Sequence, residues 1–203
     1  GKYNFRHHFA TIAPYKGHRE KEEYVRFFEP VCYEVFQELG FYDMQKQEAD
    51  DAVVVAGKLF QDEYNITFVN VDKDLKQFGA VKQFNPRKNE FESWTYEEGR
   101  KFFWSQHIMG DAVDNIKGIP RQGPKSKYIE AINALDPYTE EAAYEIVRDA
   151  YIAKFGDNAL DALAENHILL KMLNKPMLDY DPKVIVPVPY LKAKEKEINI
   201  LDI

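Results

Sequence analysis

The stretch 106–128 constrains this chain more than any other, because it places acidic residues and glycines at short, fixed spacing. Asp111 and Asp114 stand one helical turn apart, and Gly118 and Gly123 follow five residues apart. Glycine has no side chain, so the backbone can turn sharply there or approach a ligand closely. The spacing predicts a helix, a tight glycine turn and a second helix. An ordinary helix–turn–helix connection is the alternative, and the acidic pair immediately upstream favours a functional site.

The run PKSKYIEAI after the second glycine begins with Pro124 and carries Lys125 and Lys127. Proline is favoured at the first position of a helix, and we therefore predict a helix over 124–135. The first amides of a helix point outward and bind anions. We expect the turn amides and these lysines to contact a phosphate backbone.

Two more acidic groups precede this stretch. Glu48, Asp50 and Asp51 lead into a predicted buried helix, and a predicted strand ends in Asp72 and Asp74. At an effective dielectric near 20, two carboxylates ~5 Å apart repel by roughly 3 kcal/mol. Such a group persists where a cation neutralises it or where it splays into water, and acids are also common at solvated helix starts. Carboxylates at the C-terminal end of a strand lie where α/β sheets bind ligands.

Several of these segments resemble one known family. GDAVDNIKGIPRQGPK resembles the helix–three-turn–helix signature of the 5′ nucleases, which comprise flap endonucleases and 5′–3′ exonucleases. YKGHR resembles the YKxxR element of that family, EADD matches its second acidic motif, and VDKDL resembles the next one. The order of the motifs and the short segment between YKGHR and EADD are most similar to a bacteriophage-type enzyme. Arg121 and Gln122 depart from the family pattern, which has a small and an apolar residue there.

The resemblance covers about residues 1–178 and implies an α/β fold. It predicts a PIN/5′-nuclease-like central, mostly parallel sheet flanked by helices, with a helix–three-turn–helix DNA-binding subdomain. We expect a nuclease core over 1–105, the hairpin region with scaffold helices over 106–178, and a C-terminal tail over 179–203. The family begins with two strand-end aspartates that precede the first residue of this chain. We therefore expect an N-terminally incomplete core that lacks two ligands of the first metal ion.

The resemblance also implies a site for two Mg²⁺ or Mn²⁺ ions, which prefer hard oxygen ligands. Glu48 and Asp50 would hold the first ion, with Asp50 a candidate bridge between the two. Asp72, Asp74 and Asp111 would hold the second, and Asp51 and Asp114 would act through water. Lys16 and Arg19 would face the scissile phosphate. The expected DNA-binding residues, with K⁺ a further candidate ligand at the hairpin, are Arg6, Lys117, Gly118, Arg121, Gly123, Lys125 and Lys127.

The predicted activity is structure-specific, metal-dependent 5′–3′ exonuclease or flap endonuclease hydrolysis of DNA, with RNA primers as a further substrate, in replication or repair. The expected partners are DNA with free 5′ ends, flaps or RNA–DNA junctions, because phosphate contacts position a duplex without reading its sequence. A structure-specific DNA-binding fragment without turnover is the alternative, since two ligands are expected to be missing. The glycine hairpin disfavours a PIN-like nuclease of another kind and an aspartate-based phosphatase.

Composition bounds these expectations. The chain has 203 residues, which suits one domain or one domain with a subdomain. Its net charge of −7 does not exclude nucleic acid, because the local sign decides binding and a metal site inflates the acidic count. The single cysteine, Cys32, is predicted to be a small core residue and fits a reducing cytoplasm. No membrane span or signal peptide is expected, so we predict a cytoplasmic protein, in the bacterial host if phage-encoded.

The remaining segments predict scaffold. Apolar spacing predicts an amphipathic helix over 20–39, kinked or split at Pro30. A hairpin is expected to turn at Pro86–Asn89, and Thr95 with Glu98 predicts a capping box. Further helices are predicted over 139–155 and 158–174. The tail is expected to lie over the surface or to be partly disordered, and His7, His8 and His18 are expected at the surface.

Overall fold

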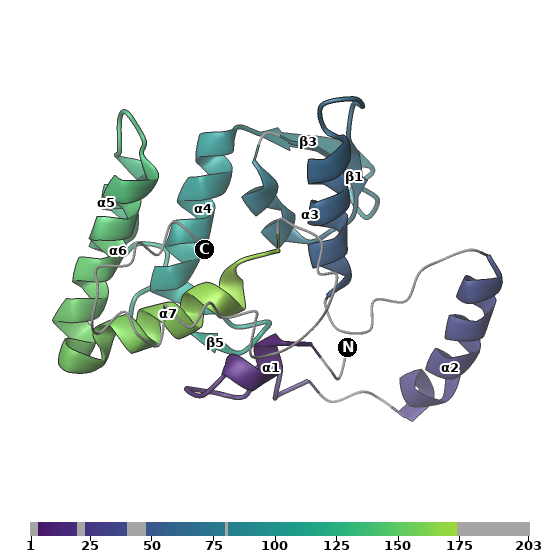
Figure 1. The fold of residues 1–203 in the computed structure, drawn as a ribbon, viewed down its shortest axis with the longest axis horizontal. Coiled ribbons are helices and arrows are strands. Elements are labelled where there is room, and N and C mark those ends of the chain that lie inside the picture. Colours follow the sequence, from purple (N-terminus) through teal and green to yellow (C-terminus); the bar gives the residue numbers. More distant parts are fainter. Residues whose placement is uncertain (1–3, 20–22, 40–47, 80, 174–203) are drawn as a thin grey trace.

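Figure 1 shows the computed structural model of the chain, which describes residues 4–19, 23–39, 48–79 and 81–173. The α-helices of this part are α1 (Arg6–Phe9), α2 (Glu23–Glu38), α3 (Ala49–Phe60), α4 (Tyr96–Met109), α5 (Lys127–Asn133), α6 (Glu140–Phe155) and α7 (Ala159–Leu170). The 3₁₀-helices are η1 (Lys73–Phe78) and η2 (Gly156–Asn158). The strands are β1 (Thr67–Val69), β2 (Val81–Asn85), β3 (Glu90–Trp94), β4 (Gly110–Asp111) and β5 (Ile116–Lys117).

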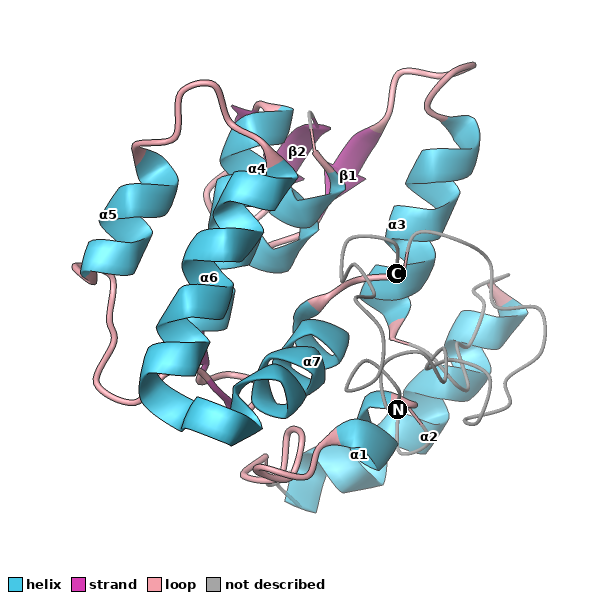
Figure 2. Cartoon of the chain, turned by 60° about the vertical axis from the view of Figure 1, so that its left-hand side comes forward, coloured by secondary structure: helices cyan, strands magenta, loops and turns pink. Residues whose placement is uncertain are grey.

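Helices α4 to α7 pack together and share a large apolar core; we call this group the helical layer (Figures 1 and 2). Phe103, Trp104 and Ile108 of α4 are fully buried against Val147 of α6 and Leu163 of α7. Helices α4, α5 and α6 also begin at a side-chain cap, which satisfies otherwise unpaired amides. The capping box predicted at the start of α4 is confirmed, because the Thr95 hydroxyl accepts a hydrogen bond from the Glu98 amide.

A small mixed sheet and α3 form the second part of the fold. β1 pairs in parallel with β2, and β2 pairs antiparallel with β3 across the predicted hairpin turn. Val54 of α3 packs with Phe68, Leu75 and Phe78 in a second apolar cluster beneath this sheet. The α/β class is therefore confirmed, while the described strands of this sheet form one parallel and one antiparallel pair rather than a mostly parallel array.

The segment after α4 turns back on itself through the antiparallel pair β4–β5. Gly110 has a φ of 75°, and a Cβ at Gly118 would lie 2.2 Å from the backbone nitrogen of Gly110. Gly118 is thus required by close backbone packing against the end of α4. The next helix, α5, begins at Lys127 because Ser126 is its N-cap and accepts from the Tyr128 amide. The predicted start at Pro124 was wrong, since the stronger capping residue lies two positions later.

Helix α2 differs most from its prediction. The helix continues through Pro30 without being split, and Figure 1 shows it set apart from the helical layer. Its apolar side chains face solvent: Phe27 is 72% exposed and Phe28 56%. Cys32 is exposed as well, so its prediction as a core residue was wrong. The predicted residues 20–22 at the start of this helix lie outside the described part.

Other predictions concern the helical layer and its ends. The helix predicted over 139–155 is confirmed as α6, whereas the one predicted over 158–174 ends at Leu170, because Lys171 is extended. The boundary expected at 105/106 lies inside α4, so the division into two parts stays a prediction. The three surface histidines are exposed as expected. The tail 179–203 lies outside the described residues. Among the described helices, none is long and apolar enough to cross a membrane.

Candidate active site

A cleft of about 470 Å³ gathers the acidic residues from three distant segments of the chain. Its walls come from the start of α3, the segment that joins β1 to η1, and the β4–β5 turn. Six of the seven predicted carboxylates line it, together with both predicted catalytic cations: Glu48, Asp50, Asp72, Asp74, Asp111 and Asp114, with Lys16 and Arg19. The sequence motifs thus converge in space as predicted, although the role of each residue remains a prediction.

Local backbone structure fixes the carboxylates in place. Glu48 forms a capping box with Asp51 at the start of α3. Asp72 caps η1 and accepts a 2.8 Å hydrogen bond from the Asp74 amide. Asp111 accepts from the Val113 amide at 2.8 Å. In each of these short segments, a hydrogen bond from a backbone amide therefore fixes the acidic side chain at the cleft.

Lysine and arginine side chains lie between these carboxylates. Lys16 contacts Glu48 and lies 3.6 Å from Asp114, and Arg19 lies 2.6 Å from Asp114. Lys73 lies between the other pair of carboxylates, in contact with Asp111 and 3.1 Å from Asp74. Its place inside the VDKDL motif was the available signal, but the sequence did not indicate which groups its ammonium would neutralise.

Tyr15, the first residue of YKGHR, is a second site residue that the sequence analysis missed. Its side chain is buried, and its hydroxyl lies 2.9 Å from Asp114 and 3.1 Å from Glu48. One hydroxyl hydrogen can serve only one of the two carboxylates at a time. Burial and the two neighbouring carboxylates raise the pKa of Tyr15 above its usual value. The residue therefore stays neutral and links the YKGHR segment to both acidic groups.

Burial and mutual repulsion make the centre of the cleft unfavourable for unbalanced negative charge. Burial, with Asp72 and Glu48 nearby, raises the pKa of Asp50 to about 6. The pKa of Asp74 is also raised, mainly by burial. Burial alone would raise the pKa of Glu48, but Arg6 and Lys16 outweigh it and hold that pKa below its usual value. A cation added near Asp50 would relieve this repulsion.

The carboxylates do not yet surround a single point. Within the described ranges, no three acidic, histidine or cysteine side chains are arranged closely enough to hold one metal ion. The donor set nevertheless suits a hard divalent cation, because the side chains that converge on the cleft offer oxygen atoms. The two lysines hold the carboxylates in their present arrangement, so metal binding requires their ammonium groups to move.

Arg6 and Asp51 bind each other, a contact that the sequence did not predict. Both side chains are buried, and the guanidinium binds the carboxylate through two hydrogen bonds of 2.7 and 2.8 Å. Arg6 also donates to the backbone oxygens of Leu169 and Lys171. Arg6 lines the acidic cleft although it is 2% exposed, whereas Asp51 is 1% exposed and does not line the cleft. Their predicted roles, in DNA binding and in acting on the metal site through water, stay predictions.

The predicted DNA-binding turn is an open surface on the helical layer. Residues 121–127 line a depression of about 680 Å³. Arg121, Lys125 and Lys127 are exposed, and a Cβ at Gly123 would meet nothing within 4 Å. Lys117 is exposed on β5, where its ammonium donates to Asn115. The backbone and the cations of this turn are therefore accessible to a large ligand.

Comparison with known proteins places this geometry in context. No family model matches the sequence. The chain is 32% identical over 178 residues to DNA polymerase I of Streptococcus pneumoniae serotype 4, across 79% of this chain and 20% of the polymerase. It is 27% identical over 183 residues to DNA polymerase I of Bacillus subtilis, again across 79% and 20%. The chain thus spans about a fifth of the length of these curated relatives.

A solved structure supplies the fold comparison. The bacteriophage T5 flap endonuclease, crystallised with DNA and metal ions, is 19% identical to the chain, with a TM-score of 0.50 over 82% of this chain and 79% of that one. The described elements therefore have the α/β fold of a flap endonuclease, with acidic residues gathered in one cleft. The chain belongs to the 5′ nuclease family. Its expected bacteriophage origin remains a prediction.

Proposed function

We propose that this chain is a divalent-metal-dependent 5′ nuclease that hydrolyses DNA phosphodiester bonds at free 5′ ends or flaps. The observation that carries the proposal is the convergence of six carboxylates from three segments on one cleft with Lys16 and Arg19. Oxygen donors of this kind suit Mg²⁺ or Mn²⁺. The relatives named above, a DNA polymerase and a flap endonuclease solved with DNA, support a nucleic-acid substrate.

We assign the metal ligands from the motifs shared with the 5′ nuclease family, and the presence of these carboxylates in one cleft supports the assignment. Glu48 and Asp50 would hold one ion, and Asp72, Asp74 and Asp111 would hold a second. When bound, such ions supply Lewis-acid polarisation of the phosphate and stabilise the charge that develops on it. Asp114 lines the same cleft and contacts Arg19 and Tyr15. We assign Asp114 to positioning these side chains and not to direct coordination.

The cations of the cleft would bind the substrate. Lys16 and Arg19 lie at its rim, where Arg19 is 46% exposed, and both now pair with carboxylates. Once a metal ion neutralises Glu48, Lys16 is free to bind the scissile phosphate, whereas Arg19 would bind it with the N–H groups that Asp114 leaves unused. The turn 121–127 would hold the duplex at a distance from the cut through its amides, Lys125 and Lys127, with K⁺ a further candidate ligand. Contacts of this kind select substrate shape and not base sequence.

The test combines metal binding with cleavage. Mn²⁺ is titrated into the chain by calorimetry, and a 5′-flap DNA, a blunt duplex and an RNA–DNA junction are assayed for Mg²⁺-dependent cleavage. We expect Mn²⁺ binding and preferential cleavage of the flap. Asp72→Asn should remove binding of the second ion and abolish cleavage, whereas Asp62→Asn, which changes an exposed carboxylate beyond the end of α3, should change neither. Cleavage that persists in chelator, or metal binding unchanged by Asp72→Asn, would refute the proposal.

The alternative is a DNA-binding module without turnover. The described acidic residues do not form a closed metal site, and this observation keeps the alternative in view. It predicts flap-selective DNA binding with no cleavage at any Mg²⁺ or Mn²⁺ concentration. The same assay therefore separates the two functions.

A further inference from the structure

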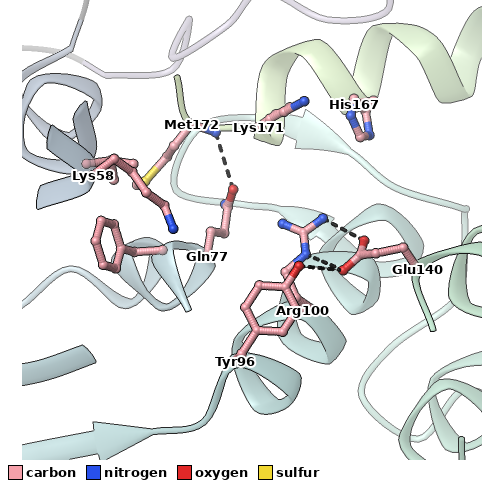
Figure 3. Close-up of a pocket in the computed structure, with 10 residues that line it drawn as sticks. Lys58, Gln77, Tyr96, Arg100, Glu140, His167, Lys171 and Met172 are labelled. Atoms are coloured by element: carbon pink, nitrogen blue, oxygen red, sulfur yellow. Dashed lines mark hydrogen bonds and ion pairs between the residues drawn. The ribbon is translucent and has the colours of Figure 1, made fainter. Parts of the chain in front are cut away.

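A second cavity, of about 240 Å³ (Figure 3), shares one lining residue with the acidic cleft. Met172 lines both cavities, so the chain that follows α7 separates them. The second cavity is built by Lys58 of α3, Arg100 of α4, Glu140 of α6 and His167 of α7. None of these residues belongs to the proposed nuclease site. At this volume the cavity suits a small molecule and not a nucleic-acid strand.

Positive charge exceeds negative charge around this cavity. Three cations line it, Lys58, Arg100 and Lys171, against one carboxylate, Glu140. Glu140 is already fully engaged: it accepts from Arg100 at 2.6 and 2.8 Å and from Trp104 at 2.9 Å. The two hydrogen bonds from Arg100 to Glu140 use two of the five N–H groups of the arginine, so three remain for another acceptor. Within the described ranges, the Lys58 ammonium and the remaining N–H groups of Arg100 therefore have no matching anion at the cavity.

Lys58 is the most available of these donors. Its ammonium lies 4.3 Å above the ring of Phe78, and no hydrogen bond or ion pair to it is found among the described residues. Burial and the charge of Arg100 lower the pKa of Lys58. Burial and the charge of Arg100 both destabilise the charged form of Lys58, and a nearby anion would stabilise it.

His167 contributes a buried acceptor to the same cavity. His107 can only donate its Nδ1 hydrogen to the carbonyl of Phe103, at 3.0 Å, because a carbonyl has no hydrogen. In the neutral ring, Nε2 of His107 must then accept from Nδ1 of His167, at 3.1 Å. The remaining nitrogen of His167, Nε2, is left with a lone pair. It is buried and has no hydrogen-bond partner in the described structure.

The neutral state of this pair is consistent with its surroundings. Both rings are fully or almost fully buried, His107 at 0% and His167 at 3% exposure. Burial, the partner histidine and the charges of Lys171 and Arg100 lower the pKa of His167 well below its usual value. A ligand that satisfies Nε2 must therefore bring its own hydrogen. Figure 3 shows the ring projecting from α7 toward Arg100 and Glu140.

We propose that this cavity binds a small protonated oxyanion, monohydrogen phosphate, with Lys58 and Arg100 on its charged oxygens and the buried Nε2 of His167 accepting its P–O–H hydrogen. Inorganic phosphate keeps at least one such hydrogen at neutral pH, whereas sulfate has none. A phosphate monoester has a second pKa near 6 and has mostly lost its hydrogen at neutral pH. The combination of two cations with one hydrogen-bond acceptor, Nε2 of His167, therefore selects inorganic phosphate over sulfate and over phosphate monoesters.

The test is titration calorimetry of the whole chain in chelator at neutral pH and constant ionic strength. The probes are inorganic phosphate, sulfate and methyl phosphate. We expect phosphate to bind, and sulfate and methyl phosphate to bind at least about tenfold more weakly, the cost of leaving one buried acceptor unpaired. Equal affinity for phosphate and sulfate, or no phosphate binding, would overturn the proposal. Methyl phosphate binding as tightly as inorganic phosphate would overturn the selection for the free ion.

Two variants locate the site. Lys58→Gln should weaken phosphate binding about tenfold, because it removes one charged donor. Lys82→Gln is the matched control, since Lys82 also lies over a phenylalanine ring, at 4.2 Å from that of Phe91, but does not line the cavity. Unchanged binding in Lys58→Gln, or equal loss in both variants, would place the phosphate elsewhere. Lys58 is only half-buried, so this variant should fold. Metal-dependent cleavage is not a readout here, so failure of the nuclease proposal would leave this test intact.

Discussion

The guanidinium of Arg6 and the carboxylate of Asp51 face each other in the protein interior, joined by two hydrogen bonds of 2.7 and 2.8 Å. Asp51 is 1% exposed, whereas its neighbour Asp50 lines the acidic cleft. Two adjacent carboxylates therefore have separate tasks: one holds the fold together and the other faces the site. Substitution of each should separate stability from metal binding.

Asp51→Asn should lower the free energy of unfolding by about 3–5 kcal/mol, because it leaves a buried guanidinium without its counter-charge. Urea denaturation measures this change. Asp50→Asn is the control. The pKa of Asp50 is raised to about 6, so its ionised form costs stability above that pH, and the amide should raise stability at pH 7.5 by on the order of 1 kcal/mol after allowance for partial exposure. Similar losses in both variants would contradict the separation of roles.

Lys73→Ala should strengthen Mn²⁺ binding several-fold. The Lys73 ammonium lies between Asp74 and Asp111, where it neutralises the oxygens that would hold the second ion. Its removal leaves those carboxylates repelling each other until a metal ion binds. Calorimetric titration of Mn²⁺ provides the measurement. Lys76→Ala is the control, because the Lys76 ammonium lies near the rings of Trp94 and Phe102 and contacts no carboxylate in the described residues. Weaker binding in Lys73→Ala would mean that the lysine orients the ligands.

Lys125→Ala should weaken binding of duplex DNA of every sequence alike. The residue is exposed on the turn 121–127, and a phosphate contact carries no base information. Each lost phosphate contact should also reduce the slope of log affinity against log salt by about one. Fluorescence anisotropy over a salt series measures both effects. Lys154→Ala, at the exposed end of α6, should change neither. A loss confined to particular sequences would argue against backbone binding by this turn.

The buried histidine pair should make the fold sensitive to acid. Burial lowers the pKa of His107 from 6.5 to about 3, and that of His167 is lowered too. The unfolded chain therefore binds protons below pH 6.5 that the folded chain does not, so stability is present above that pH and lost as pH falls. The charged groups nearest the pair, Arg100 and Lys171, reinforce this direction.

We expect a loss of about 2 kcal/mol for each histidine between pH 6.5 and pH 5. Urea denaturation across this range provides the measurement. His107→Gln should reduce the slope of the free energy of unfolding against pH by the amount that corresponds to roughly one bound proton, because glutamine does not titrate. A slope that is the same in both proteins would show that the acid sensitivity has another source.

The sequence predicted the acidic segments well because each is a local pattern. A helix that starts after Glu48 and a strand that precedes Asp72 and Asp74 follow from short runs of residues, and the fold then brings these segments together. The strand itself ends at Val69, because Asp72 caps η1 instead of ending the strand. The partners of individual cations could not be predicted in this way. Arg6 meets Asp51 across 45 residues and Leu169 across 163, and no local pattern encodes such distances.

Competing local signals explain the remaining errors. Pro124 and Ser126 both indicate a helix start, and only the observed hydrogen bond from the Tyr128 amide decides between them. The apolar spacing around Cys32 predicts that one helix face is apolar, but it does not specify what covers that face. Tyr15 and Lys73 lie inside the YKGHR and VDKDL motifs. Their contacts depend on side-chain directions that only the assembled fold defines.

The interior contacts of Arg6 have a consequence for how the molecule denatures. The two apolar clusters have no buried residue in common, so nothing in their packing alone obliges them to melt together. Arg6, however, binds Asp51 of α3 and the carbonyls of Leu169 and Lys171, while the Leu173 amide donates to the same aspartate. Local unfolding of either α3 or α7 therefore breaks hydrogen bonds to Arg6 or Asp51 and leaves buried polar groups without partners in the part that stays folded. The slowest-exchanging amides of α3 and α7 should therefore exchange at one common rate, through a single cooperative unfolding event.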